Sequence, residues 1–206
     1  MADLAGRLAA IPVAEMCDTM EAAGLTPALL PLPSSAWRFA GPAVCLSAGA
    51  TALPIATVDA AVTAGSVVVV GPGGGATGAL VGGNMVTAWR RSGCKALVVD
   101  GQIRDSEAFA GLPLLCRGTT PLNSRKRWCI GAVDVPLVIE GITIHPGDWL
   151  HGDQDGTIVI PQAGLARLLP WAERVGLVER CMRDRIAAGA DRQQVYAADR
   201  YGHIIP

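Results

Sequence analysis

The sequence of 206 residues carries a formal net charge of −1 at pH 7, and half of its residues are hydrophobic. A pI near 6.3 argues against electrostatic binding to nucleic acid or to an anionic membrane surface. Aromatic residues make up only 4% of the chain, which is poor for the stacking of bases. With a mean hydropathy of +0.36, the chain can bury a sizeable core, and we expect one domain over residues 1–206.

Targeting signals and clustered metal ligands are missing from the sequence. The N-terminus "MADLAGRLAAIP" lacks the basic start and apolar core of a signal peptide, and no apolar run approaches the eighteen or so residues of a membrane span. The six cysteines form no C-x-x-C motif, and the three histidines are not spaced for a zinc site. These features predict a reduced, cytoplasmic protein whose cysteines mostly fill the core.

Helices and buried strands alternate over the first two thirds of the chain. Glycines and hydrophobic periodicity predict helices over 13–25, 57–65 and about 79–92, and strands over 40–48, 66–71, 95–100 and 112–118. We expect Asp100 to end its strand and the chain beyond it to turn to antiparallel pairing. The sequence thus predicts an α/β fold.

Short alternating strands follow from residue 130, separated by Gly141, Pro146-Gly147 and Asp155-Gly156, and residues 163–189 have the apolar spacing of a helix. In "GDQDG", turn chemistry favours a β-turn over a calcium site. We expect His145 and His151 to lie at exposed strand ends. This part of the chain predicts a β-meander and a C-terminal helix.

Two glycine clusters suggest different ligands. "GGGATG" (73–78) follows a strand, precedes a helix and matches G-x-G-x-x-G, with Asp100 available for a ribose hydroxyl, so a dinucleotide-binding domain is one alternative. In "GGNM", Gly82, Gly83, Asn84 and Met85 open a helix whose bare amides can receive a carboxylate or phosphate. Equally, the two glycines could serve close packing against a neighbouring element.

The stretch "VVDGQIRDSEAF" (98–109) runs from an apolar strand into Arg104 and Asp105. A guanidinium can hold the carboxylate and keto oxygens of a 2-oxo acid in a bidentate way, which a lysine cannot. A neighbouring carboxylate can hold a hydrated Mg²⁺ ion that polarises the same keto oxygen. Together the pair predicts stabilisation of an enolate, although a turn salt bridge is the simpler reading of such a pair.

Gly83, separated by twenty residues from Arg104-Asp105, resembles the signature of the RraA-like family, which contains the regulator of ribonuclease E activity and metal-dependent 4-hydroxy-4-methyl-2-oxoglutarate aldolases. "CDTMEAAG", "ATVDAAVTAGSVVVVGPGGG" and "VDVPLVIEGITIHPGDWLHGDQDGTIVIP" are also similar to family segments, so the resemblance covers residues 13–189. It implies a swivelling β/β/α-type sandwich that assembles as a homotrimer or homohexamer. It also implies Mg²⁺ dependence, with Mn²⁺ or Co²⁺ as other possible metals, and pyruvate-enolate chemistry.

The same resemblance implies a role for each candidate site residue. Arg104 would bind substrate and stabilise the enolate, Asp105 would hold the metal, and the amides of Gly82 to Met85 would bind the carboxylate. Glu179, in the C-terminal helix, would reach the site of a neighbouring subunit. At two positions the chain departs from the family: Gly83 stands where aldolases commonly carry an acid, and Ala108 where the regulators carry one.

The leading hypothesis from sequence is a metal-dependent carbon–carbon lyase. It would cleave a 4-hydroxy-2-oxo dicarboxylic acid by a retro-aldol reaction, decarboxylate oxaloacetate, or do both, through a pyruvate enolate. A non-catalytic regulator that binds a ribonuclease or another protein is the alternative of a different class. The dinucleotide-binding domain is the second alternative.

Overall fold

An eleven-residue strand, β2 (Phe39–Gly49), joins the two parts of one nine-stranded sheet. Its first residues pair antiparallel with β10 (Trp149–Gly152), its middle residues pair parallel with β3 (Val67–Gly71), and its last residues pair antiparallel with β7 (Cys129–Val133). The computed structural model describes residues 2–32, 38–71, 78–124 and 129–196.

The strand order is β1-β11-β10-β2-β3-β5-β4, with β6 paired to β5 and β7 to β2. The strands not yet given bounds are β1 (Ala28–Leu29), β4 (Ala79–Val81), β5 (Ala96–Ile103), β6 (Leu114–Thr119) and β11 (Thr157–Ile160). A separate hairpin consists of β8 (Leu137–Ile139) and β9 (Ile142–Ile144). Strands β3, β4, β5 and β6 are mutually parallel where they pair, so their carboxyl ends lie at one edge.

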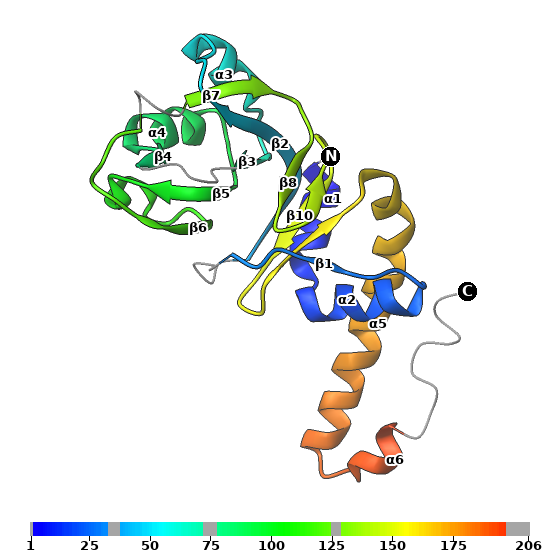
Figure 1. Cartoon of the computed structure of the whole chain (residues 1–206). Helices are drawn as coiled ribbons and strands as arrows, with labels where there is room; N and C mark the ends of the chain where they lie inside the picture. Colours follow the sequence, from blue (N-terminus) through cyan, green and yellow to red (C-terminus); the bar gives the residue numbers. More distant parts are fainter. Residues whose placement is uncertain (1, 33–37, 72–77, 125–128, 197–206) are drawn as a thin grey trace.

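Three apolar layers follow from the alternation of side chains along the strands. Val68 and Val70 of β3 face one core with α3 (Ile55–Ala61) and α4 (Gly83–Arg91), while Val67 and Val69 face a second core with the β8–β9 hairpin. The third core packs β10 and β11 against α1 (Ala2–Ala10), α2 (Val13–Ala22) and α5 (Gln162–Ala187). Figure 1 shows α3 and α4 at one end of the molecule and these three helices at the other.

The layers confirm the α/β, β/β/α-type sandwich expected from the sequence, and the predicted C-terminal helix is α5. Its second half extends away from the sheets, and the short helix α6 (Arg192–Tyr196) lies beyond its far end (Figure 1). Among the described residues, no helix is both long enough and apolar enough to be a candidate membrane span.

The structure corrects three details of the sequence-based prediction. Residues 79–81, expected to begin a helix, form β4, because these three apolar residues pair with the end of β5 and the helix begins only after Gly82. Asp100 lies inside β5 rather than at its end, because the strand continues to Ile103. The chain beyond it also continues in parallel pairing, since β6 runs parallel to β5 after a single 3-10 turn, η1 (Ser106–Phe109).

Candidate active site

The candidate site forms where β4 and β5 end side by side. Because the two strands are parallel, the residues that follow them meet at one edge of the sheet, the usual position of ligand sites in such sheets. Gly82 follows β4 and caps α4, and Arg104 follows β5. The backbone N–H of Arg104 donates to the carbonyl of Val81 at 3.1 Å, which holds the two segments together.

Gly82 and Gly83 let the Arg104-Asp105 segment approach the start of α4. A β-carbon on Gly82 would lie 3.1 Å from the Arg104 Nε atom, and one on Gly83 would lie 3.0 Å from the β-carbon of Asp105. Side chains at these two positions would therefore push the arginine and the aspartate away. The close-packing interpretation of the glycines is correct, and it does not compete with the anion-binding one.

Asp105 adopts a left-handed backbone conformation, with φ 58° and ψ 50°. This conformation is uncommon for a residue other than glycine, although aspartate tolerates it better than most. Its Oδ2 atom accepts a hydrogen bond from the Gly83 N–H at 3.0 Å and lies 3.7 Å from Arg104 Nε. With side-chain exposures of 32% for Arg104 and 55% for Asp105, the pair is a weak salt bridge, and both charged groups can reach a ligand.

Two of the backbone amides at the start of α4 already have partners within the protein. Gly83 N–H is bonded to Asp105, and Met85 N–H donates to the carbonyl of Gly82 at 3.1 Å. The backbone N–H of Asn84 is therefore a better candidate for binding a carboxylate than the N–H groups of Gly83 and Met85. The positive end of the helix dipole still favours an anion here.

Two cavities adjoin this edge, and Arg104 lines both. One, of about 620 Å³, is also lined by Asp105, Glu107, Thr119 and Thr120. The other, of about 500 Å³, is lined by Gly82, Asn84 and Met85 at the start of α4 and by apolar residues of α3 and β7. Arg104 thus lies between the carboxylates of Asp105 and Glu107 on one side and the amino-terminal end of α4 on the other.

Sequence reasoning missed Thr119, the last residue of β6, and Thr120, which follows it, at the same edge as Arg104. The signal was present, since a third parallel strand beside β5 places its carboxyl end there. The antiparallel pairing expected beyond Asp100 hid it. Glu107, two residues after Asp105, lines the same cavity and adds a second carboxylate.

A divalent metal of the oxygen-preferring kind fits these residues. No group of three or more histidine, cysteine, aspartate or glutamate residues occurs in the described parts of the chain, which is unlike a zinc site. Mg²⁺ instead keeps several waters and binds through one or two carboxylates together with substrate oxygens. The half-exposed Asp105, with Glu107 lining the same cavity, supplies that number of ligands.

Glu179 lies far from Arg104 within the chain. It belongs to the second half of α5, and Figure 1 shows α5 at the other end of the molecule from α4. Its side chain is 13% exposed and lies 3.7 Å from Arg183. If Glu179 acts at a site, that site belongs to another copy of the chain.

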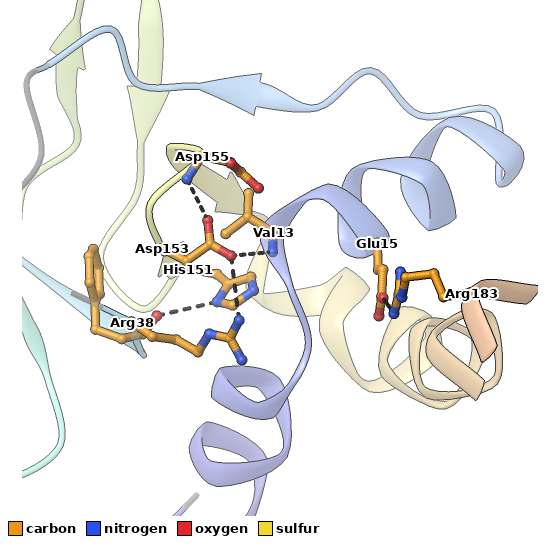
Figure 2. A network of polar contacts seen from close by, with 8 residues as sticks. Val13, Glu15, Arg38, His151, Asp153, Asp155 and Arg183 are labelled. Atoms are coloured by element: carbon orange, nitrogen blue, oxygen red, sulfur yellow. Dashed lines mark hydrogen bonds and ion pairs between the residues drawn. The ribbon is translucent and has the colours of Figure 1, made fainter. Parts of the chain in front are cut away.

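The two acidic turns of "HPGDWLHGDQDG" are structural. Asp148 accepts hydrogen bonds from the His145 and Gln162 backbones, and Asp153 accepts them from the Val13 and Asp155 backbones at 2.9 and 3.0 Å. Figure 2 shows Asp153 joining the turn to the start of α2. The chain does reverse at residues 153–156, between the antiparallel strands β10 and β11, and Asp153 also links this connection to the start of α2.

His151 was expected at an exposed strand end, and this prediction is wrong. Its side chain is fully buried between β2 and the helices, and its Nδ1–H donates to the carbonyl of Phe39 at 3.2 Å (Figure 2). Burial lowers the pKa of His151, although the nearby Asp153 opposes that change. The neutral imidazole therefore belongs to the core and lies outside the candidate site.

The groups of the dinucleotide alternative are engaged elsewhere or not described. Asp100 is buried and forms an ion pair with Arg117, which also pairs with Glu140, so its carboxylate is not free for a ribose. Of the glycine-rich motif at 73–78, only Gly78 falls within the described residues.

The cysteines that lie deepest behave as core residues, as expected. Burial raises the pKa of Cys45 to about 12 and that of Cys94 to about 11, so neither forms a thiolate at neutral pH. All six cysteines are free.

The fold and the edge site define an α/β protein whose candidate ligand-binding groups gather at the carboxyl ends of parallel strands. The sequence model of the RraA-like family, described as "Aldolase/RraA", matches residues 13–159. The chain belongs to this family. It is 36% identical over 158 residues to a protein of Burkholderia mallei (strain SAVP1) named "Putative 4-hydroxy-4-methyl-2-oxoglutarate aldolase", covering 72% of this chain and 94% of that protein.

Solved structures share the fold. A crystal structure of a protein from Pseudomonas syringae pv. tomato str. DC3000 superposes with a TM-score of 0.83 and 29% identity, covering 95% of this chain and 97% of that one. Streptomyces coelicolor RraAS2, described as an unusual member of the RNase ES inhibitor RraA protein family, superposes with a TM-score of 0.79 and 28% identity, covering 89% and 96%. The family thus includes proteins named as aldolases and proteins named as inhibitors.

Proposed function

We propose that the protein is a divalent-metal-dependent carbon–carbon lyase that releases pyruvate from a small 2-oxo acid. The substrate would be a 4-hydroxy-2-oxo acid cleaved by a retro-aldol reaction, oxaloacetate undergoing decarboxylation, or both. The observation that carries the proposal is the position of Arg104. Its partly exposed guanidinium lines one cavity with Asp105 and another with the start of α4.

Arg104 would bind the substrate and stabilise the enolate that both reactions produce. Its planar guanidinium can contact the 1-carboxylate and the 2-oxo oxygen together, and its positive charge favours the negative charge that develops on that oxygen. The backbone bond from Arg104 N–H to Val81 and the close approach at Gly82 hold this side chain in place before substrate arrives. The Asn84 amide at the helix start would receive the remaining carboxylate oxygen.

Asp105, with Glu107 in the same cavity, would hold Mg²⁺, Mn²⁺ or Co²⁺. When bound, such an ion supplies Lewis-acid polarisation of the keto oxygen. The Gly83 N–H bond to Oδ2 of Asp105 fixes the carboxylate and leaves it half exposed. That arrangement suits a metal-binding carboxylate, which must be held in a fixed orientation and yet be accessible to the ion.

A lysine Schiff base would be the other way to form the enolate, and the positions of the lysines argue against it. The chain has two, Lys95 and Lys126. Lys95 is exposed and precedes the first residue of β5, whereas Arg104 follows the last, so the two lie at opposite ends of the strand. Lys126 lies outside the described residues.

We also propose that the protein works as a homotrimer or homohexamer in which Glu179 of one subunit reaches the site of the next. The extension of α5 beyond the sheets and the 59% exposure of Leu177 beside Glu179 support this proposal. Mixing inactive Arg104→Lys and Glu179→Ala subunits tests it, because mixed oligomers would contain some intact sites. An active monomer by light scattering would contradict it.

The decisive experiment measures pyruvate release from oxaloacetate and from 4-hydroxy-2-oxoglutarate. We expect a chelator to abolish activity and Mg²⁺ to restore it. Asp105→Asn should weaken metal binding about tenfold or more, because the charge is lost. Its amide oxygen can still accept from Gly83 N–H, so the melting temperature should change little. Borohydride trapping of substrate on a lysine, or full activity in chelator, would overturn the metal-dependent mechanism.

A regulator that binds a ribonuclease is the second candidate, favoured by the extensive structural similarity to RraAS2. Oxalate mimics the enolate of pyruvate, so calorimetry with oxalate separates the two functions. Tight binding that requires Mg²⁺ and Arg104 supports the lyase. Absence of oxalate binding together with capture of a ribonuclease would support the regulator.

A further inference from the structure

The cavity of about 500 Å³ beside Arg104 has a polar part and an apolar part. Gly82, Asn84 and Arg104 provide the polar groups already discussed. Asn123 and Ser124 also line the cavity, and the Ser124 hydroxyl donates to the Ala79 carbonyl at 2.6 Å. Large apolar side chains from four different segments line it too: Leu53, Ile55, Val58, Leu80, Met85 and Ile130. A volume of this size lies in the range of about 300–1,000 Å³ that holds drug-sized ligands, which is more room than a three-carbon keto acid needs.

The charges around this cavity are unevenly distributed. Among the described lining residues the one cation is Arg104, and the proposed function assigns it to the 1-carboxylate and the 2-oxo oxygen. The one anion is Asp59, whose Oδ1 atom accepts a hydrogen bond from the Trp89 indole N–H at 3.1 Å. Because Trp89 is fully buried, this bond fixes the carboxylate of Asp59 at the cavity. Among the described lining residues beyond Arg104, a second substrate carboxylate would meet a like charge at Asp59, the uncharged polar side chains of Asn123 and Ser124, and apolar walls.

The exposure of Ile55 also indicates that the cavity suits an apolar group better than a second carboxylate. Its side chain is 79% exposed although it lines the cavity, and α3 could have carried a polar residue at no cost to the core. Val58, one turn further along α3, is buried and lines the cavity too. This face of α3 thus presents an apolar surface from the rim of the cavity to its wall.

From these observations, and resting on the proposed function, we infer that the site prefers 4-hydroxy-2-oxo acids whose C4 substituent is uncharged and apolar. Those with a second carboxylate at C4 would be poorer substrates. In the reaction, the C4 hydroxyl proton passes to solvent, the C3–C4 bond breaks to give an aldehyde and the pyruvate enolate, and solvent protonates C3. No oxidant or reductant is consumed.

A matched pair of substrates tests the inference with the whole protein and Mg²⁺. 4-Hydroxy-2-oxohexanoate gives pyruvate and propanal, whereas 4-hydroxy-2-oxoglutarate gives pyruvate and glyoxylate, so the two differ at C4 by ethyl against carboxylate. We expect kcat/KM to favour the hexanoate by about tenfold or more. A preference for the glutarate would overturn the inference and leave the lyase standing. Pyruvate from neither compound would overturn both.

Two variants test whether Ile55 and Asp59 determine this substrate preference. Ile55→Arg adds a cation at an exposed position of the lining, and Asp59→Asn removes the anion while its amide oxygen can still accept from Trp89. Each should shift the ratio of kcat/KM values towards the dicarboxylate by about tenfold. Val138→Arg, at a position 53% exposed on the β8–β9 hairpin, is the control for added charge and should leave the ratio unchanged. A ratio that shifts equally in all three variants, or in none, would contradict the assigned specificity.

Discussion

Two aspartates of this protein cap helices through the same kind of hydrogen bond, in opposite environments. Asp105 accepts from Gly83 N–H at the start of α4, and Asp153 accepts from Val13 N–H at the start of α2. Each also has an arginine nearby, Arg104 at 3.7 Å and Arg38 at 4.0 Å. Yet Asp105 is half exposed beside a cavity, whereas Asp153 is 6% exposed and also holds the Asp155 N–H.

The difference shows how one local motif can serve two purposes. Around Asp153, each carboxylate oxygen accepts a backbone N–H, so the group contributes to stability and has little left for a ligand. Around Asp105, the contacts with Gly83 N–H and Arg104 Nε both go through Oδ2, and the charge remains accessible. Exposure next to a cavity, rather than the presence of an Asp-Gly or Arg-Asp pair, separates the candidate catalytic region from the structural one.

The largest difference between the two regions should appear on replacing their arginines. Arg104→Lys keeps the charge but loses the planar fork, and we expect turnover to fall by about 10²-fold or more, as for loss of an oxyanion donor. Arg38→Lys, beside Asp153, is the matched control and should retain activity. The measurement is pyruvate release, with melting temperature as the folding control. Normal turnover in Arg104→Lys would mean that the Arg-Asp pair only closes a turn.

For the stability of the fold, the structural region should matter more: replacing Asp153 should lower the free energy of unfolding more than replacing Asp105. Asp153→Ala leaves the buried Val13 N–H and the part-buried Asp155 N–H without their acceptor, which should lower the free energy of unfolding by about 2–3 kcal/mol. Asp105→Ala removes a solvent-accessible cap and should cost about 1 kcal/mol. Urea unfolding followed by circular dichroism measures both. Equal losses would mean that the two caps do not differ in burial as the structure has them.

The smallest effect concerns pH and belongs to the buried region alone. Burial lowers the folded-state pKa of His151 below its usual 6.5, so the unfolded chain binds the proton more readily. The contribution to stability is therefore present above pH 6.5 and is lost as pH falls from there through the folded pKa. His151→Asn, whose amide can still donate to Phe39, should flatten this dependence in urea titrations at about pH 5.5 and 7.5. An unchanged slope would exclude His151 as its source.

Local patterns were sufficient for much of this protein. Hydrophobic periodicity located β2, β3, β5, β6 and α5 to within a few residues, since each element buries its own apolar face. The helix predicted over 13–25 ends at Ala22, close to its predicted end, because Gly24 at φ +75° allows the Leu25 N–H to bond the Met20 carbonyl. The apolar triplet of β4 was misassigned, because a three-residue strand has too few residues for its period to differ from that of a helix.

What the sequence by itself determined was the family, the α/β character and the position of Arg104-Asp105 at the end of a strand, because these depend on residues close together in the chain. The tertiary structure alone decided the parallel pairing of β6, the burial of His151, and the capping of α4 by Asp105 and of α2 by Asp153. Gly83 and Asp105 are 22 residues apart, and Val13 and Asp153 are 140 apart. Local propensities cannot predict pairs so far apart in the sequence. Whether a carboxylate stays exposed or has its hydrogen bonds satisfied depends on which distant backbone N–H groups the packing of the layers brings to it.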